Sequence, residues 1–414
     1  MKRIKQILLK TIILVVVTFV ALLTIGWTWY LARINMQIIP IGYVNIKDLG
    51  AKGDGVTDDA PIIQLAENMG KSIYFPKGTY RLCSNLVKRN KVNWLGCGYD
   101  SIILINGAPY SYGSSNIVQN ENYGIIDAAR GISEEWDYGY KNTGKLDGFE
   151  FKNLTIKFRS SLKSGEQPES GYIHVFNFSH TNGVKITNVF MDSDINTNRG
   201  NCIFVFRGGN YNTTIENCNM IYDTNPSVLY GGSVVFASRS TSDPIQKVII
   251  RNNTITKKNG GDEVLWFGAN FNAINDVLIE NNTIQAVSAG LTKASIIMFA
   301  QDSGEMLRGV SEPWNKIVIK NNNIVTNKIN FSTIFVGYDF GTNSRKGGTV
   351  TISNNLINTL KSTSTGETVS GILVGRTKIV FIQNNTIIGN QDEGVTAEVE
   401  VGTVSDIANH ITWK

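Results

Sequence analysis

Acidic side chains recur at the ends of short apolar segments in this chain. They are Asp262 and Glu263 in GGDEVLW, Asp302 and Glu305 in FAQDSGE, and Asp339 in VGYDF. If these segments are strands stacked in register, the acids lie on one ridge, about 5–10 Å apart. Two carboxylates at that separation can hydrolyse a glycosidic bond, one as acid and the other as base or nucleophile. The pattern predicts catalytic residues here, and solvated turn residues are the alternative.

Basic and aromatic side chains end the same segments and could bind the substrate of such a reaction. The candidate substrate-binding residues are His174, Arg207, Arg239, Trp266 and Tyr338. Arginine holds a carboxylate through two parallel hydrogen bonds, so Arg207 and Arg239 suit an anionic sugar. Trp266 could stack on a sugar ring. A surface histidine and two loop-anchoring arginines are the alternative interpretation.

A repeat close to V-x-I-x-N-N-x-I, found eight times, supplies the elements that would position these side chains. The clearest copies are at 248–255, 277–284, 317–324, 350–357 and 380–387, and weaker ones begin at Phe149, Val184 and Thr213. The first asparagines of the copies are residues 153, 188, 217, 252, 281, 321, 354 and 384. Self-similarity at such a period is the signature of a solenoid.

Each copy shows the period-two alternation of a strand, which the Asn-Asn pair interrupts. Asparagine suits a corner because it tolerates the left-handed backbone region. Stacked about 4.8 Å apart, these asparagines could form a ladder of side-chain amides. A second apolar strand lies between copies, as at 264–267 and 296–299. The predicted fold class is all-β, a right-handed single-stranded parallel β-helix of about 9–11 coils.

The N-terminus carries a candidate membrane anchor. Four cations within residues 1–10 precede an apolar run at 11–31, about the 20 residues that cross a bilayer. The cationic side is expected to stay cytoplasmic. We therefore expect a basic cytoplasmic flank at 1–10, a transmembrane helix at 11–31 and a linker at 32–44, with the main domain periplasmic or extracellular. A cleaved signal peptide is the alternative.

Charge and cysteine content limit the partners and cofactors. The chain has 39 Lys and Arg against 34 Asp and Glu, and four of the cations lie in the N-terminal flank, so a nucleic-acid surface is not expected. Four cysteines do not form a disulfide framework, although Cys83 and Cys97 could pair. No metal-ligand spacing occurs, and no cofactor is predicted. The expected partners are a polysaccharide and, through 11–31, a membrane; the oligomeric state stays open.

A Gly/Asp-rich string precedes the repeats. DLGAKGDGVTDDA at 48–60 leads into a helix with Thr57 or Asp58 as the expected N-cap and with residues 62, 65, 66 and 69 as its apolar face. This helix would cover the open end of the first coil. With YFPKGTY at 74–80 and VKRNKVNWLGCGYDSIIL at 87–104, the string resembles the N-terminal signature of the pectate-lyase-like superfamily, in its rhamnogalacturonase-, epimerase- and phage-tailspike-type branch.

The resemblance implies a right-handed parallel β-helix that acts on polysaccharides in a groove along one sheet. We expect an N-terminal cap and first coils at 45–105, an irregular insertion at 106–147, β-helix repeats at 148–390 and a C-terminal cap at 391–414. The polygalacturonase-type set of NTD, DD, GHG and RxK and the epimerase-type DPHD string are absent. No catalytic residue is therefore transferred from the family.

The combined prediction is a membrane-anchored, extracytoplasmic glycoside hydrolase that cleaves a surface polysaccharide or exopolysaccharide with paired carboxylates. A lyase or epimerase of the same fold is the nearest alternative, and only the lyase would call for calcium. A non-catalytic carbohydrate-binding or polysaccharide-assembly factor is the alternative from a different class.

Overall fold

The chain divides into two units, residues 1–41 and 42–414. The computed structural model describes residues 2–33, 39–84, 86–89, 91–106, 124–127, 146–159, 173–179, 181–195, 201–224, 233–238, 243–258, 263–269, 272–286, 295–301, 310–326, 332–339, 345–359, 370–389, 393–397, 403–407 and 409–412. Most of the predicted insertion at 106–147 falls outside these ranges.

Helix α1 (Lys2–Arg33) makes up most of the first unit, so a helix is present where one is predicted. Its side chains at 10–26 are all exposed. Among the residues that the structure describes, no helix combines the length and the apolarity needed to cross a membrane. The transmembrane helix predicted at 11–31 is therefore not supported by the structure.

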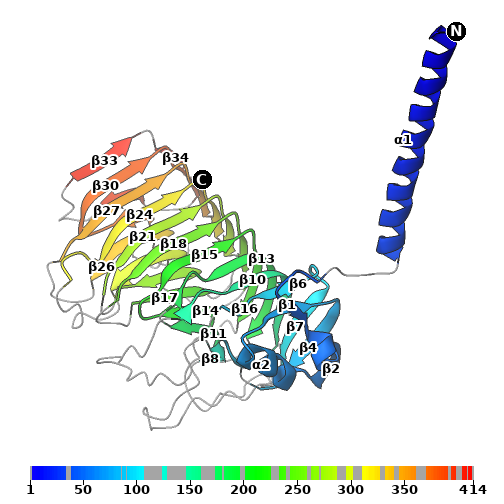
Figure 1. Cartoon of the computed structure of the whole chain (residues 1–414). Helices are drawn as coiled ribbons and strands as arrows, with labels where there is room; N and C mark the ends of the chain where they lie inside the picture. The colour runs from blue at the N-terminus through cyan, green and yellow to red at the C-terminus, as the bar shows by residue number, and fades with distance from the viewer. Residues whose placement is uncertain are drawn as a thin grey trace. The chain divides into compact units, whose positions relative to one another are not determined.

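The second unit is a solenoid of parallel strands (Figure 1). One strand from each coil enters a ten-stranded sheet, in which each strand pairs in parallel with that of the next coil. These strands are β5 (Leu86–Val87), β8 (Gly124–Asp127), β11 (Ile173–Ser179), β14 (Asn201–Arg207), β17 (Val234–Ala237), β20 (Leu265–Gly268), β23 (Ile297–Gln301), β26 (Ile334–Asp339), β29 (Ser370–Val374) and β32 (Glu393–Ala397). The prediction of an all-β parallel solenoid is confirmed.

The other strands form a 24-stranded sheet that bends at the asparagine corner into two rows. The row before the corner includes β15 (Tyr211–Glu216), β18 (Ile245–Arg251), β21 (Ile274–Glu280), β24 (Trp314–Lys320), β27 (Gly347–Ser353), β30 (Thr377–Gln383) and β33 (Thr403–Ile407). The row after it includes β16 (Asn219–Thr224), β19 (Thr254–Lys257), β22 (Thr283–Ala286), β25 (Asn323–Thr326), β28 (Leu356–Thr359), β31 (Thr386–Gly389) and β34 (His410–Thr412).

The first coils add shorter strands to the same sheet. They are β1 (Tyr43–Asn45), β2 (Asp54–Asp58), β3 (Ser72–Phe75), β4 (Gly78–Leu82), β6 (Trp94–Gly96), β7 (Ser101–Asn106), β9 (Leu146–Asp147) and β12 (Thr181–Asn182). Strands β10 (Glu150–Arg159) and β13 (Lys185–Ile195) each continue across the corner as one strand. At the other end, β32, β33 and β34 continue both sheets, so the predicted C-terminal cap at 391–414 contains a further rung.

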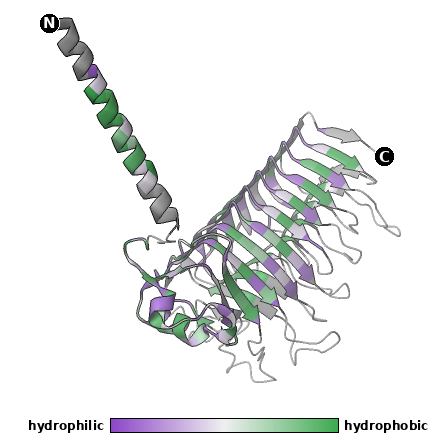
Figure 2. Cartoon of the chain, turned by 90° about the vertical axis from the view of Figure 1, so that its right-hand side faces the viewer, coloured by the Kyte–Doolittle hydropathy of each residue, from purple (hydrophilic) through white to green (hydrophobic). Residues whose placement is uncertain are grey.

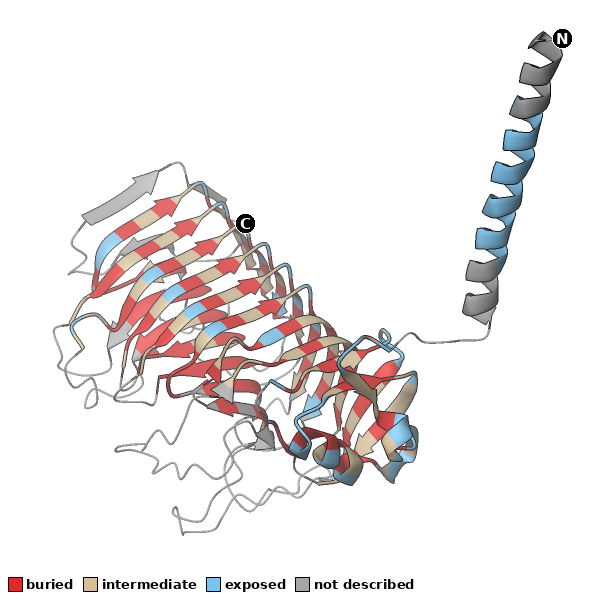
Figure 3. Ribbon diagram, viewed as in Figure 1, coloured by how far each residue is buried: buried red, intermediate tan, exposed pale blue. Residues whose placement is uncertain are grey.

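Inward-facing side chains fill the solenoid with stacked apolar rows. Figure 2 shows hydrophobic and hydrophilic bands along the strands, and Figure 3 shows buried positions alternating with intermediate or exposed ones. Inside the ten-stranded sheet, Phe206, Phe236, Phe267 and Phe299 stack face to face, with ring centroids 4.5, 4.9 and 4.2 Å apart. The rung spacing of a parallel sheet, about 4.8 Å, imposes this separation.

The first asparagine of each repeat adopts the left-handed backbone conformation, as predicted. The φ angles are 52–56° at Asn153, Asn188, Asn217, Asn252, Asn281, Asn321, Asn354 and Asn384. This conformation turns the chain at every rung without the steric cost that most other residues would carry there.

The second asparagine forms the amide ladder. We define the asparagine ladder as Asn253, Asn282, Asn322, Asn355, Asn385 and Asn409. Each Nδ2 donates to the Oδ1 of the next member at 2.9–3.0 Å, and each of these Oδ1 atoms also accepts the backbone N–H of the preceding member at 2.8–3.0 Å. The Nδ2 atoms donate to core carbonyls as well, for example from Asn282 to Ile250. The sequence predicts the corner and the ladder from the asparagine pair as a whole. In the structure the first asparagine forms the corner and the second forms the ladder.

Three aspartates of the N-terminal string fold its loop. Their carboxylates accept backbone N–H groups, Asp54 from Val56 and Thr57, Asp58 from Ala60 and Cys83, and Asp59 from Lys52 and Gly53. Hydrogen bonds from Thr57 and Val56 lower the pKa of Asp54 to about 2. Helix α2 (Ala60–Asn68) has Asp59 at its N-cap position, one residue after Asp58 and two after Thr57, the two predicted candidates.

The buried face of α2 differs from the predicted one because it carries a charge. Leu65 and Met69, expected to be buried, are 47% and 49% exposed. Glu67 is buried instead, and its Oε1 accepts from Lys88 Nζ at 2.8 Å and from Trp94 Nε1 at 2.5 Å. Burial lowers the pKa of Lys88, and Glu67 opposes that shift. A hydrophobic pattern cannot show a polar residue that is buried together with its partner.

The cysteines are free thiols where the structure describes their side chains. Cys83 and Cys97, left open as a pair by the sequence, are not bonded to each other. Cys218 takes the ladder position one rung before Asn253 and donates its backbone N–H to Asn253 Oδ1 at 2.9 Å. Burial raises the pKa of the Cys218 thiol to about 12, so this cysteine packs as a neutral side chain.

Replacing a ladder residue should destabilise the solenoid far more than replacing its neighbour. Asn322→Leu removes the acceptor of Asn282 N and Asn282 Nδ2, and each buried group left unpaired costs about 1–3 kcal/mol. Asn321→Gly is the matched control, because Asn321 is exposed and its φ of 55° suits glycine. We expect a clear drop in the urea midpoint for the first variant and little change for the second. Equal midpoints would contradict a structural role for the ladder.

Candidate functional site

The ten residues predicted to form the site fall into three groups. Four lie outside the described residues: Asp262, Asp302, Glu305 and Arg239. Four lie in strands of the ten-stranded sheet with only the backbone described: His174, Arg207, Tyr338 and Asp339. The two whose side chains are described are Glu263 and Trp266.

Two of the predicted acids, Glu263 and Asp339, lie at opposite edges of the ten-stranded sheet. Asp339 ends β26, opposite Gln301, the residue before Asp302. Glu263 instead precedes β20, and the pairing of β20 with β23 aligns it about six residues before Gln301. Six residues of extended strand span roughly 20 Å, too far for a carboxylate pair. The prediction of one ridge is therefore wrong for Glu263, because it ignored whether an acid stands before or after its strand.

Glu263 lies beside a buried cation at the amino edge of the sheet. Its backbone carbonyl accepts a hydrogen bond from Lys257 Nζ at 3.1 Å. The Lys257 side chain faces inward from β19, is fully buried, and lies 5.8 Å from the centre of the Tyr222 ring. Lys257 thus helps to hold the edge where β20 begins.

Trp266 lies flat on the outside of the ten-stranded sheet because Gly268 leaves it room. A Cβ placed on Gly268 would come within 2.3 Å of Trp266 Cη2 and 2.6 Å of Cζ2. The indole therefore covers the backbone of Gly268, and the side chain remains partly exposed. The residues paired with Gly268 in the flanking strands are also small, Ala237 and Ala300. These small residues leave a flat sheet surface beneath the indole.

Trp266 belongs to an apolar row that follows the solenoid axis. Strand register aligns six outward-facing residues, which we call the apolar row: Val205, Val235, Trp266, Met298, Phe335 and Leu373. Val205, Val235 and Ala237 cluster with Trp266 apart from the main core. Trp266, Met298 and Leu373 are partly exposed. A row with one member per rung suits an extended ligand with apolar patches.

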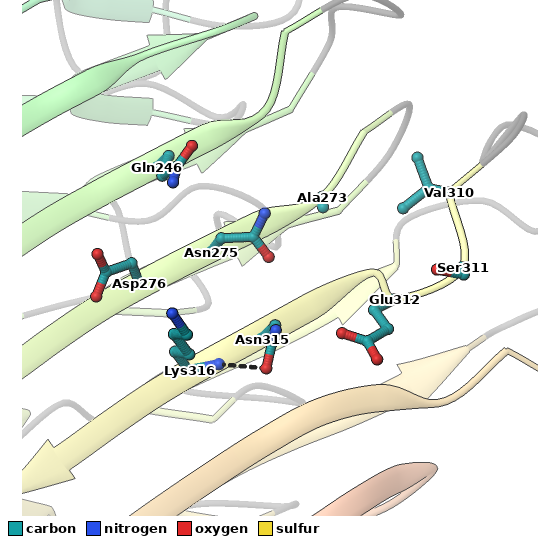
Figure 4. Close-up of a pocket in the computed structure, with 9 residues that line it drawn as sticks. All are labelled: Gln246, Ala273, Asn275, Asp276, Val310, Ser311, Glu312, Asn315 and Lys316. Carbon is teal, nitrogen blue, oxygen red and sulfur yellow. Dashed lines mark hydrogen bonds between the residues drawn. The ribbon is translucent and has the colours of Figure 1, made fainter.

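A pocket of about 410 Å³ lies around the corner from this row, on β18, β21 and β24 (Figure 4). Its lining residues are Gln246, Ala273, Asn275, Asp276, Val310, Ser311, Glu312, Asn315 and Lys316. Three amides come from successive rungs, since Gln246 pairs with Asn275 and Asn275 with Asn315. We call Gln246, Asn275 and Asn315 the amide row.

A second left-handed turn produces the amide row. The residue after each amide has a positive φ, 58° at Lys247, 57° at Asp276 and 53° at Lys316. This site is not among the predicted ones, although the sequence carries a signal for it. An amide and a charged residue precede three consecutive copies of the repeat, as QKV, NDV and NKI.

No residue set in the described part of the chain forms a metal site. Groups of three or more His, Cys, Asp or Glu side chains placed to hold an ion are not found among the described residues. The amide row supplies hydrogen-bonding groups and the apolar row supplies apolar contacts.

Known proteins similar to this chain share segments of it. A 124-residue segment is 32% identical to an alginate lyase 7 of Azotobacter vinelandii, covering 25% of this chain and 14% of that protein. A 212-residue segment is 24% identical to a probable glucan endo-1,3-beta-glucosidase of Arthroderma benhamiae, covering 42% and 22%. The chain therefore spans less than a quarter of the length of either relative.

Structural comparison supports the solenoid over nearly the whole chain. The surface adhesin PfbA of Streptococcus pneumoniae superposes with a TM-score of 0.58 at 16% identity, covering 89% of this chain and 91% of that one. At this identity the likeness concerns the fold alone. The family model for rhamnogalacturonase A/epimerase, pectate lyase-like proteins matches residues 43–292, more than half of the sequence. This chain therefore belongs to the rhamnogalacturonase A/epimerase, pectate lyase-like family.

Proposed function

We propose that this chain is a polysaccharide-active enzyme that holds its glycan along the apolar row and hydrolyses it. The packing of the Trp266 indole over Gly268 is the observation that carries the proposal. A flat, partly exposed indole offers a sugar ring an apolar face, and two further members of the row, Met298 and Leu373, are partly exposed on other rungs. Membership of a family named for rhamnogalacturonase and epimerase supports a carbohydrate as the ligand.

Asp302 and Asp339 are the carboxylates that we propose for catalysis. Gln301, next to Asp302 in the sequence, pairs with Asp339 across one rung. Directly paired residues on neighbouring rungs are about 4.8 Å apart at the backbone. Because Asp302 follows the partner of Asp339 by one position in the sequence, we propose that the two carboxylates come within the roughly 5–10 Å that glycoside hydrolysis uses. One would protonate the leaving oxygen, and the other would act as base or nucleophile. Glu263 is left out of this pair because it stands at the opposite edge.

Two other functions remain as alternatives. The similar proteins include one named as a lyase and one named as a glucosidase, so a lyase or epimerase on the same fold is the nearest alternative. A non-catalytic glycan-binding or assembly factor is the second, and two observations favour it. Glu263 does not lie at the edge where Asp339 ends β26, and a similarly folded protein is described as an adhesin.

We also propose that the N-terminal segment holds the domain at a membrane, facing the exterior. The support comes from the sequence, an apolar run at 11–31 behind four cations. Alkaline carbonate washing of membranes from expressing cells tests it. The full chain should stay with the membranes, and its release into the wash would contradict the anchor.

Removing the indole of Trp266, or the space that Gly268 leaves for it, should weaken glycan binding. Trp266→Ala deletes the stacking surface, and Gly268→Val displaces the ring without altering it. Affinity electrophoresis against a panel of neutral and acidic polysaccharides should show a loss of about tenfold or more for both variants on the polysaccharide that wild type binds. Leu65→Ala, at an exposed apolar residue of α2, serves as the control. Unchanged retardation of both variants would refute the apolar row as the binding face.

Asp302→Asn and Asp339→Asn should each abolish hydrolysis while the protein stays folded. Loss of a general acid or base lowers turnover by about 10²–10⁴-fold. Release of reducing ends from the bound polysaccharide is the measurement, and Glu263→Gln is the matched control because it changes an acid at the other edge. Full activity in both Asn variants would eliminate this pair. Formation of unsaturated uronate would point to the lyase, and an altered sugar ratio to the epimerase.

A further inference from the structure

We infer that the amide row is a second glycan site, which binds a neutral oligosaccharide on the face next to the apolar row. The inference rests on the proposed function, because it takes the ligand of this solenoid to be a carbohydrate. It assigns a separate position and a sugar class to a surface that has no part in the proposed hydrolysis.

Backbone geometry turns the three amides outward at regular spacing. The left-handed residues at 247, 276 and 316 follow the amides in register. Figure 4 shows Gln246, Asn275 and Asn315 on successive strands, with Val310, Ser311 and Glu312 on the segment beside them. Adjacent members are one rung apart, about 4.8 Å. This spacing is comparable to the length of one pyranose unit, so successive sugars can meet successive amides.

The hydrogen-bonding capacity of the row is largely unused within the described structure. Among described residues, the side-chain amides of Gln246 and Asn275 have no hydrogen-bond partner. Asn315 differs, because its Oδ1 accepts the backbone N–H of Lys316 at 2.9 Å and of Thr349 at 3.0 Å. That arrangement fixes the amide and leaves its Nδ2 as a donor. An amide both donates and accepts, which matches the hydroxyl groups of a sugar.

Charge in the pocket favours a neutral sugar. The charged residues of the lining are Asp276, Glu312 and Lys316, two carboxylates against one ammonium group. Glu312 Oε1 lies 2.7 Å from Lys378 Nζ, which offsets one carboxylate. The lining charges that remain, Asp276 and Lys316, are one of each sign, so the lining itself has no cationic excess that would attract a polyuronate. Hydroxyl-rich neutral chains therefore fit the site better.

The two carboxylates of the pocket are placed for binding rather than for hydrolysis. Register sets Glu312 four residues before Lys316, and Lys316 lies opposite Asp276. Glu312 lies before the start of β24 (Trp314–Lys320), and Figure 4 shows it on the other side of Asn315 and Lys316 from Asp276, so the two acids do not form a facing catalytic pair. The lining also holds no aromatic residue, so affinity must come from hydrogen bonds. Such a site should gain affinity as more sugar units reach more rungs.

The decisive experiment measures calorimetric binding of the full chain to neutral gluco-, manno- and galacto-oligosaccharides, from disaccharide to octasaccharide, with oligogalacturonides for comparison. The variant Gln246→Ala/Asn275→Ala removes two amides that have no structural partner and spares Asn315. We expect about tenfold weaker binding of the longest neutral ligand. Gln285→Ala, an exposed amide of β22 on another face, should match wild type.

A charge variant tests the preference for neutral sugars. Asp276→Lys places at φ 57° the residue type that already occupies the same left-handed position in the flanking rungs, Lys247 and Lys316. The backbone should therefore accept the substitution. We expect binding of oligogalacturonide to rise at least fivefold in this variant. No gain would overturn the assigned selectivity.

The remaining outcomes separate this inference from the proposed function. If Trp266→Ala weakens binding and Gln246→Ala/Asn275→Ala does not, the amide row is not a glycan site and the proposed function stands. If wild type binds oligogalacturonides alone, the neutral site is likewise refuted. If no sugar binds and the Trp266→Ala variant equals wild type, the proposed function fails as well. Unchanged far-ultraviolet circular dichroism and melting temperature exclude misfolding as the cause.

Discussion

The buried amide ladder is the interaction on which the rest of this structure depends. A solenoid buries polar backbone at every corner, and an unpaired amide there would cost more than most single contacts contribute. The asparagine ladder pairs those groups with one another from Asn253 to Asn409. Because each member binds its equivalent one rung away, the ladder also fixes the register of the strands on either side. Residues far apart in the sequence thereby become neighbours.

That register gives both outer surfaces their order. The apolar row exists because the same strand position recurs outward on the ten-stranded sheet, from Val205 to Leu373. The amide row exists because a second left-handed turn recurs before three consecutive repeats, at Lys247, Asp276 and Lys316. One surface offers flat apolar contact, and the other offers hydrogen bonds. A carbohydrate has both kinds of group, and the two surfaces lie on adjoining faces of one coil.

Features that depend on residues close together in the sequence could be predicted, whereas features that depend on tertiary contacts could not. The left-handed asparagine at each corner follows from residue type and repetition, so the solenoid could be predicted. The direction of Glu263 relative to the carboxyl edge depends on strand start and end, and an apolar run alone does not define these. Glu67 lies on the buried face of α2 because Lys88 meets it from elsewhere in the chain, a pairing that helical periodicity cannot reveal. The amide row was visible as a repeated dipeptide but lacked meaning until its turn geometry was known.

The intervals between successive corner asparagines differ, although the strands on both sides of each corner pair rung by rung without a gap. All variation in repeat length must therefore be absorbed by the connections that lead into and out of the ten-stranded sheet. The 24-stranded sheet stays constant, whereas the connections that border the ten-stranded sheet differ in length from coil to coil. Insertions and deletions in those connections would change the borders of that face and leave the strand pairing of the 24-stranded sheet intact, at little cost to stability.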